Sequence, residues 1–165
     1  MPTLLIVYHS MTDGTRQMAQ AAADGAAGEA GEAVQVRLLH AAGAGPDDVL
    51  ESDGYLFATP ENLGSMAGIM KDFFDRSYYA ALDQLNGRPY AVLVCAGSDG
   101  SQAARQVERI ATGWRLRLVA PTLIVSTHAQ TAERILARKT IAPDDLQHCR
   151  ELGAALASGL ELGIF

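Results

Sequence analysis

The sequence of 165 residues has little of what several protein classes require. Its two cysteines, Cys95 and Cys149, suit neither a disulfide framework nor a zinc site by number or separation. Thirteen Lys and Arg against 19 Asp and Glu give a net charge of −6, without any dense basic cluster. We therefore expect no nucleic acid and no anionic membrane among the partners, because both need a basic patch. The four histidines are scattered and lack metal-ligand spacing.

Long apolar runs are also missing. None approaches the roughly 18 residues that a membrane-spanning helix needs. The start of the chain, residues 1–7, lacks the basic region of a signal peptide, and its apolar run is too short for one. We therefore expect a cytoplasmic protein with reduced thiols. The length fits one domain over residues 1–165.

Short apolar runs alternate with longer helical patterns along the whole chain. The predicted strands cover residues 3–8, 34–39, 54–59 (stopped by Pro60), 90–96 and 116–125 (interrupted by Pro121). The predicted helices cover residues 14–29, 67–82, 101–114 and 143–160, with a short helical turn from residue 46 and an irregular or partly helical stretch over 126–141. One helical face carries Met66, Met70, Phe73 and Phe74, which we interpret as core, and Lys71 and Arg76 as a solvated face.

This α/β alternation predicts a five-stranded parallel sheet covered by helices on both faces, hence a three-layer fold. Five strands with right-handed crossovers favour the order 2-1-3-4-5 over a six-strand sheet. In that order a ligand binds outside the carboxyl ends of strands one and three. The loops at residues 9–15, 59–66 and 97–101 are therefore the candidate site.

The first loop follows a strand and opens a helix, a position where backbone N–H groups point at an anion. The hydroxyls of Ser10, Thr12 and Thr15 could add donors, and Gly14 permits close backbone approach. The loop matches neither the Walker pattern nor G-x-G-x-x-G. We interpret it as a phosphate cradle without a lysine. The alternative is an ordinary helix cap.

The other two loops are small and polar. In the second, Asn62 and free backbone amides could bind the edge of a heteroaromatic ring, while Gly64 and Ser65 favour a turn. In the third, residues 97–101, small side chains let a planar ligand approach the backbone. The alternative in both cases is an ordinary turn that connects a strand to a helix.

Together the segments YHSMTDGT (8–15), TPENLGSMAG (59–68) and KDFFD (71–75) resemble the flavodoxin superfamily. Within it, the chain is most similar to the NAD(P)H-dependent FMN reductases and the quinone oxidoreductases of the tryptophan-repressor-binding (WrbA-like) type, over nearly its whole length. The resemblance implies a flavodoxin-like fold and FMN as cofactor. It implies the following cofactor-binding residues: Ser10, Met11, Thr12, Asp13, Gly14 and Thr15 around the phosphate, and Pro60, Glu61, Asn62, Leu63, Gly64, Ser65, Ala96, Gly97, Ser98, Asp99 and Gly100 around the isoalloxazine.

Two departures from the flavodoxin pattern stand out. Asp13 occupies a position where glycine is expected, and a carboxylate aimed at a phosphate would be repelled. Asp13 must therefore turn outward or cap the helix. Neither ring loop contains an aromatic residue, so one ring face would stay open to a nicotinamide, as hydride transfer requires.

The chemistry implied is an NAD(P)H-dependent oxidoreductase that passes hydride through FMN to a quinone or similar small-molecule electron acceptor. The alternatives are a flavodoxin-type electron carrier and an interaction domain without flavin, and a homo-oligomer stays open. A phospho-receiver is disfavoured because residues 9–10 and 59–60 are not acidic, and a tyrosine phosphatase because Ser101 stands where C-x5-R needs arginine after Cys95. His9 could donate a proton, but a structural role is favoured.

Overall fold

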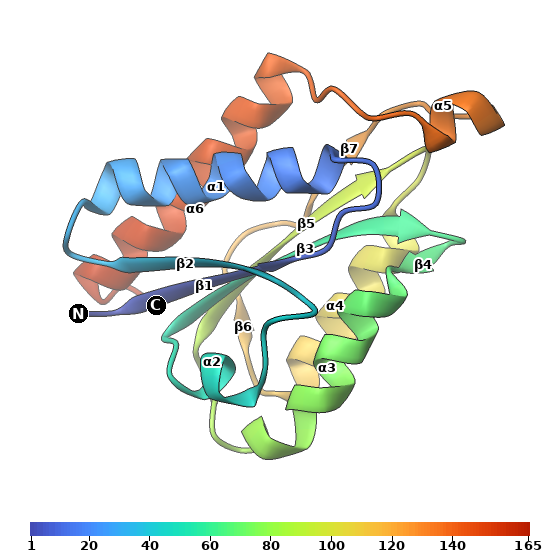
Figure 1. The fold of residues 1–165 in the computed structure, drawn as a ribbon. Helices are drawn as coiled ribbons and strands as arrows, with labels where there is room; N and C mark the ends of the chain where they lie inside the picture. The colour runs from blue at the N-terminus through green and yellow to red at the C-terminus, as the bar shows by residue number, and fades with distance from the viewer.

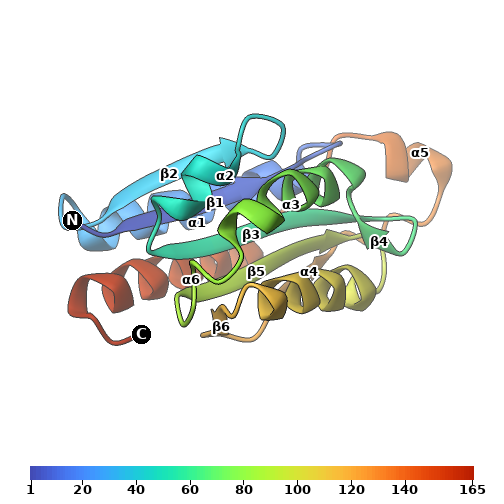
Figure 2. The ribbon, with the colours of Figure 1, turned by 90° about the horizontal axis from the view of Figure 1, so that it is seen from below.

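In the computed structural model, residues 1–165 form a mainly parallel sheet between two layers of helices (Figure 1, Figure 2). The strands are β1 (Thr3–Tyr8), β2 (Gln35–His40), β3 (Gly54–Asn62), β4 (Ser65–Met66), β5 (Pro89–Ala96), β6 (Arg117–Leu118) and β7 (Leu123–Ser126). The helices are α1 (Gly14–Ala30), α2 (Pro46–Leu50), α3 (Gly68–Ala81), α4 (Ser101–Gly113), α5 (Ala132–Leu136) and α6 (Pro143–Leu162).

The strand order is β2-β1-β3-β5-β6, with β7 also on β5 and β4 on β3. It confirms the predicted flavodoxin-like order, because β5 is the fourth expected strand and β6 and β7 together replace the fifth. All eight residues of β5 are buried. A continuously apolar strand of this kind occupies the middle of a sheet covered on both faces. The sheet has seven strands rather than the five expected.

The prediction of one strand over residues 116–125 was wrong, although its interruption at Pro121 is confirmed. The two ends of this stretch pair with β5 as β6 and β7, and the residues between them, including Pro121, form no strand. The prediction that Pro60 ends the third strand was also wrong, because β3 continues to Asn62. The pairing of β3 with β1 stops at Ala58. Pro60 lacks an N–H, but no hydrogen bond to β1 is lost at its position.

The helices divide the core into two halves. Helices α1 and α6 cover one face of the sheet, and α2, α3 and α4 cover the other (Figure 1). Met66, Met70, Phe73 and Phe74 are buried in the second half, as predicted. Lys71 is exposed and paired with Asp75, in keeping with a solvated face.

Arg76 is exposed, as predicted, but its side chain also makes specific contacts. Its guanidinium donates to the carbonyl oxygens of Ala41 and Ala44, each at 2.8 Å, and pairs with Asp72. These contacts tie α3 to the segment before α2. The residue therefore has a structural role that its helical position alone did not reveal.

Both cysteines are buried and free, in the half of the core that contains α1 and α6. Burial raises the pKa of the Cys149 thiol to about 12. None of the helices combines the length and apolar character needed to cross a membrane.

Candidate functional site

The carboxyl ends of the central strands, the amino end of α1 and the segment around α5 lie at the same end of the molecule (Figure 1). A cavity of about 570 Å³ lies between them. It unites the three loops that the sequence singled out. Its lining consists of Ser10, Met11, Thr12, Gly14, Thr15, Pro60, Glu61, Asn62, Leu63, Gly64, Cys95, Ala96, Gly97, Ser98, Thr127, Ala129, Gln130, Ile135 and Lys139.

The first loop brings two unused hydroxyls to the cavity. The Oγ of Ser10 and the Oγ1 of Thr15 are buried and have no hydrogen-bond partner. Thr15 itself is only 1% exposed. A buried polar group without a partner costs free energy, so these hydroxyls are suited to a ligand that supplies acceptor oxygens. They lie beside the amino end of α1, whose N–H groups favour an anion.

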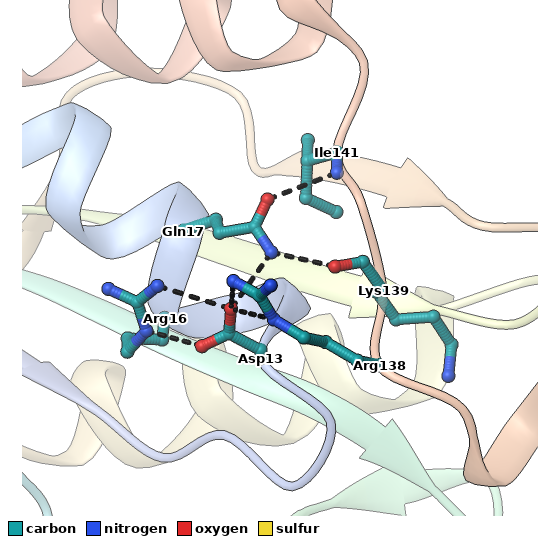
Figure 3. A network of polar contacts seen from close by, with 6 residues as sticks. All are labelled: Asp13, Arg16, Gln17, Arg138, Lys139 and Ile141. Carbon is teal, nitrogen blue, oxygen red and sulfur yellow. Dashed lines mark hydrogen bonds and ion pairs between the residues drawn. The ribbon is translucent and has the colours of Figure 1, made fainter.

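Asp13 turns outward, one of the two conformations expected for it. Its φ of 75° lies in the left-handed region that favours glycine, and aspartate is among the few other residues that tolerate it. The side chain forms no helix cap. It accepts hydrogen bonds from Arg16, from Gln17 at 3.1 Å and from Arg138 at 2.8 Å and 3.0 Å (Figure 3). Two cations therefore offset its charge.

The hydrogen bond from Arg16 is the main reason that the pKa of Asp13 lies well below its usual range, with Arg138 and Gln17 acting in the same direction. The carboxylate thus stays ionised while it faces away from the cradle. This resolves the conflict between an acidic residue in the loop and a bound phosphate.

The cradle does contain a lysine, contrary to the sequence interpretation. Lys139 comes from the stretch predicted as irregular, and its Nζ donates to the Oγ1 of Thr12 at 3.2 Å. Burial raises the pKa of the neighbouring Cys95 thiol to about 11, although the positive charge of Lys139 acts in the opposite direction. The adjacent basic pair Arg138-Lys139 was the available signal, but a sequence separation of 127 residues hid its partner.

The second loop is a tight hairpin between β3 and β4. Asn62 pairs with Ser65, and the two residues between them, Leu63 and Gly64, have φ values of 53° and 71°. Gly64 adopts this conformation readily, whereas a leucine does so only under constraint from the turn. The Leu63 side chain is fully exposed at the rim of the cavity. A bulky apolar group is thus held where a ligand would enter.

The third loop lies beside the segment after β7. A Cβ atom at Gly97 would lie 2.9 Å from the carbonyl oxygen of Ala129, so only glycine fits there. Gln130 donates from its Nε2 to the Gly97 carbonyl at 2.7 Å. Residues around Ala129 therefore form a wall of the cavity that the sequence analysis missed, because this stretch carries no motif.

Four of the expected residues lie outside the lining. Asp13 faces Arg16 and Arg138, and Ser65 accepts from the Nε2 of Gln106 at 3.3 Å. Asp99 accepts from the Ser101 hydroxyl, and Gly100 is buried under Ile124 with a φ of 79°. These four residues therefore belong to the predicted loops but do not line the cavity.

The contacts of His9 favour the structural role expected for it. The backbone N–H of Ala42 donates to the Nδ1 of His40 at 3.1 Å, which leaves the proton of neutral His40 on Nε2. That Nε2 lies 3.0 Å from the Nδ1 of His9 and donates to it. Burial, followed by the proximity of His40, lowers the pKa of His9. The ring does not line the cavity.

A family model described as NADPH-dependent FMN reductase matches residues 3–131. The chain belongs to this family. The match covers most of the chain, including the first and third loops and the hairpin, and confirms the resemblance drawn from the motifs. It reaches Gln130 of the cavity wall but ends before Lys139.

The curated relatives of this member of the FMN reductase family include both a quinone dehydrogenase and a flavodoxin. An NAD(P)H dehydrogenase (quinone) from Acidithiobacillus ferrooxidans is 36% identical in an alignment of 95 residues that covers 47% of this chain and 48% of the relative. A flavodoxin from Aquifex aeolicus is 39% identical over 75 residues, 46% of this chain and 40% of the relative. The matched part thus spans less than half the length of either relative.

Solved structures show the same fold at low identity. A flavodoxin from the domain Archaea superimposes with a TM-score of 0.79 at 19% identity, over 96% of this chain and 99% of its own. A flavodoxin, WrbA-like protein from Agrobacterium tumefaciens gives 0.72 at 18% identity, over 98% of this chain and 99% of its own.

Proposed function

We propose that this chain binds FMN in the cavity and passes hydride from NADPH or NADH to a quinone or a similar small acceptor. The observation that carries the proposal is the pair of buried hydroxyls, Ser10 Oγ and Thr15 Oγ1, which lack partners beside the amino end of α1. Each unpaired buried group costs about 1–3 kcal/mol. A phosphate would supply acceptor oxygens to both and sit at the favourable end of the helix dipole.

The rest of the cavity fits a planar ring attached to that phosphate. The hairpin at residues 61–64 and the loop at residues 96–98 line it on two sides, and apart from Leu63 their side chains are small or polar. The side-chain amide of Asn62 and the backbone groups of these loops can bind the ring edge. When bound, FMN supplies the two-electron redox chemistry, while these residues bind and orient it.

The open character of the site supports hydride transfer. None of the lining residues is Trp, Tyr or Phe. Tyr78 on α3 does not line the cavity either, and its ring stacks on Trp114 with centroids 5.7 Å apart. A nicotinamide could therefore stack on the exposed face of the ring at the close range that hydride transfer needs.

The cofactor should be FMN rather than FAD. The phosphate cradle lies directly at the start of α1, and the chain contains no second nucleotide-binding fingerprint for an adenylate. Release of the cofactor by heat, followed by chromatography, tests this point. Recovery of FAD, or failure to bind any flavin on reconstitution, contradicts the proposal.

A steady-state assay distinguishes the enzyme from the alternative electron carrier. We expect the FMN-loaded protein to oxidise NADPH or NADH with a quinone as acceptor. Bound FMN without turnover of either nucleotide would favour the carrier. In that case the exposed side chains of Met11 and Leu63 at the rim would suit a docked redox partner.

A further inference from the structure

A short segment after α5 crosses the phosphate loop and is held on both sides. We define residues 137–141 as the strap. The Lys139 N–H donates to the Thr12 carbonyl at 2.8 Å, and the Gln17 side chain bridges the Lys139 carbonyl at 2.7 Å and the Ile141 N–H at 3.2 Å (Figure 3). Arg138 adds the ion pair with Asp13. The backbone position of Lys139 over the cradle is thus fixed.

The Lys139 side chain lines the cavity. It points away from Asp13 (Figure 3). Its Cβ and Cγ would lie 3.3 Å and 3.4 Å from a Cβ atom at Gly14. Its ammonium contacts only neutral oxygens: the Thr12 hydroxyl at 3.2 Å and the carbonyls of Ile135 at 2.9 Å and Ala137 at 2.6 Å. Lys139 therefore brings an uncompensated positive charge to the cradle.

The same cradle contains the unpartnered hydroxyls of Ser10 and Thr15, an independent sign that an anion belongs there. Lys139 is the one cationic side chain in the cavity lining, and Arg16 and Arg138 are engaged by Asp13 instead. Loop hydroxyls and backbone N–H groups carry no net charge, whereas a flavin phosphate carries close to two negative charges at neutral pH.

We propose that Lys139 binds the 5′-phosphate of FMN and thereby makes the protein select the phosphorylated flavin over riboflavin. The inference rests on the proposed FMN binding and adds a ligand from a segment far from the phosphate loop in sequence. A charge-assisted hydrogen bond between an ammonium and a phosphate is among the stronger protein hydrogen bonds. The strap then closes one side of the phosphate site when FMN is bound.

Titration of the flavin-free full-length protein with FMN and with riboflavin tests the proposal by flavin fluorescence. We expect Lys139→Met to weaken FMN binding about tenfold or more and riboflavin binding less than about twofold. Lys71→Met is the matched control, because Lys71 is exposed on α3, outside the cavity, and its ammonium pairs with Asp75. It should leave both affinities unchanged.

Equal weakening of FMN and riboflavin by Lys139→Met would overturn the proposal and assign Lys139 a structural role, and no change in either would overturn it as well. Lys139→Arg, which keeps the charge, should retain most of the preference for FMN. If Lys139→Met does not fold, Lys139→Gln repeats the comparison with a neutral donor. If the Lys139→Met variant still binds FMN and prefers it to riboflavin as the wild type does, the role of Lys139 is overturned but the proposed function stands. A wild-type protein that binds neither flavin overturns both the role of Lys139 and the proposed function.

Discussion

A Cβ atom on Gly14 would lie 2.8 Å from the Sγ of Cys95. Helix α1 therefore begins in direct contact with the carboxyl end of β5, a fully buried inner strand. This close approach places the first turn of the helix, with its free N–H groups, against the floor of the cavity. Glycine is needed at this position for space rather than for an unusual backbone conformation.

Gly14→Ala should destabilise the protein by about 1–3 kcal/mol, because the added methyl group overpacks the contact with Cys95. It should also weaken FMN binding, since the phosphate loop must shift. Cys95→Ala removes the sulfur atom, so the double variant should recover part of the loss. Urea unfolding of both single variants and the double variant measures this coupling. Strictly additive losses would show that the two residues do not interact as described.

Thr15→Val should leave the stability of the flavin-free protein unchanged or slightly higher, because the hydroxyl that it removes is buried without a partner. It should weaken FMN binding about tenfold or more, since a donor to the phosphate is lost. Thr112→Val, which alters an exposed hydroxyl on α4, is the control. If Thr15 only caps the helix, stability falls by about 1 kcal/mol and the FMN affinity stays the same.

Asp13→Asn should reduce stability at neutral pH, and the reduction should fade in acid. The pKa of Asp13 is lower in the folded protein than in the unfolded chain, so its stabilising effect is complete above about pH 4 and is lost as the pH falls through the folded value. Urea midpoints of wild type and variant across this range test the prediction. Added salt should shrink the difference too, because Arg138 is exposed.

Asp24→Asn serves as the control for this comparison, because Asp24 is exposed, forms no ion pair and accepts a hydrogen bond from the neutral Gln20 side chain. It should show little effect at any pH. A stability difference for Asp13→Asn that does not depend on pH would mean that loop geometry, not charge, explains the role of Asp13.

Both thiols should remain free and slow to alkylate at neutral pH. The cysteines are buried, and burial raises the pKa values of Cys95 and Cys149 to about 11 and about 12. The thiolate, which is the reactive form, is therefore scarce. Thiol counting should give two groups under denaturing, non-reducing conditions and far slower labelling in the native state. A count of zero with the monomer intact would reveal a disulfide.

The sequence was sufficient for elements with strong local signals. The apolar runs of β1 and β5 and the breaker residues between elements fixed their positions within a residue or two. Pro121 interrupts the last predicted strand as expected, whereas Pro60 shows where a local signal misleads. Pro60 is accommodated because β3 has lost its β1 partner at that point, and this depends on strand pairing that no local pattern reveals.

The candidate site was predictable in part for the same reason. Loops that follow parallel strands meet at one edge of a sheet, which brought Ser10, Asn62 and Gly97 together as expected. The contribution of Lys139 was not predictable, because residues 127–141 lack a periodic pattern and reach the cradle through backbone contacts. The left-handed conformation of Asp13 likewise became clear only from its partners in space.

The interrupted pair β6 and β7 also affects how this protein resists aggregation. Along their side of the sheet, the outer edge consists of two residues and four residues, with Pro121 between them. A long, flat edge would offer a continuous row of free N–H and C=O groups to a strand from another molecule. Here such a strand could form only a few consecutive backbone hydrogen bonds, because the edge is interrupted at Pro121. The break in the strand therefore protects the apolar sheet from growing by strand addition at this edge.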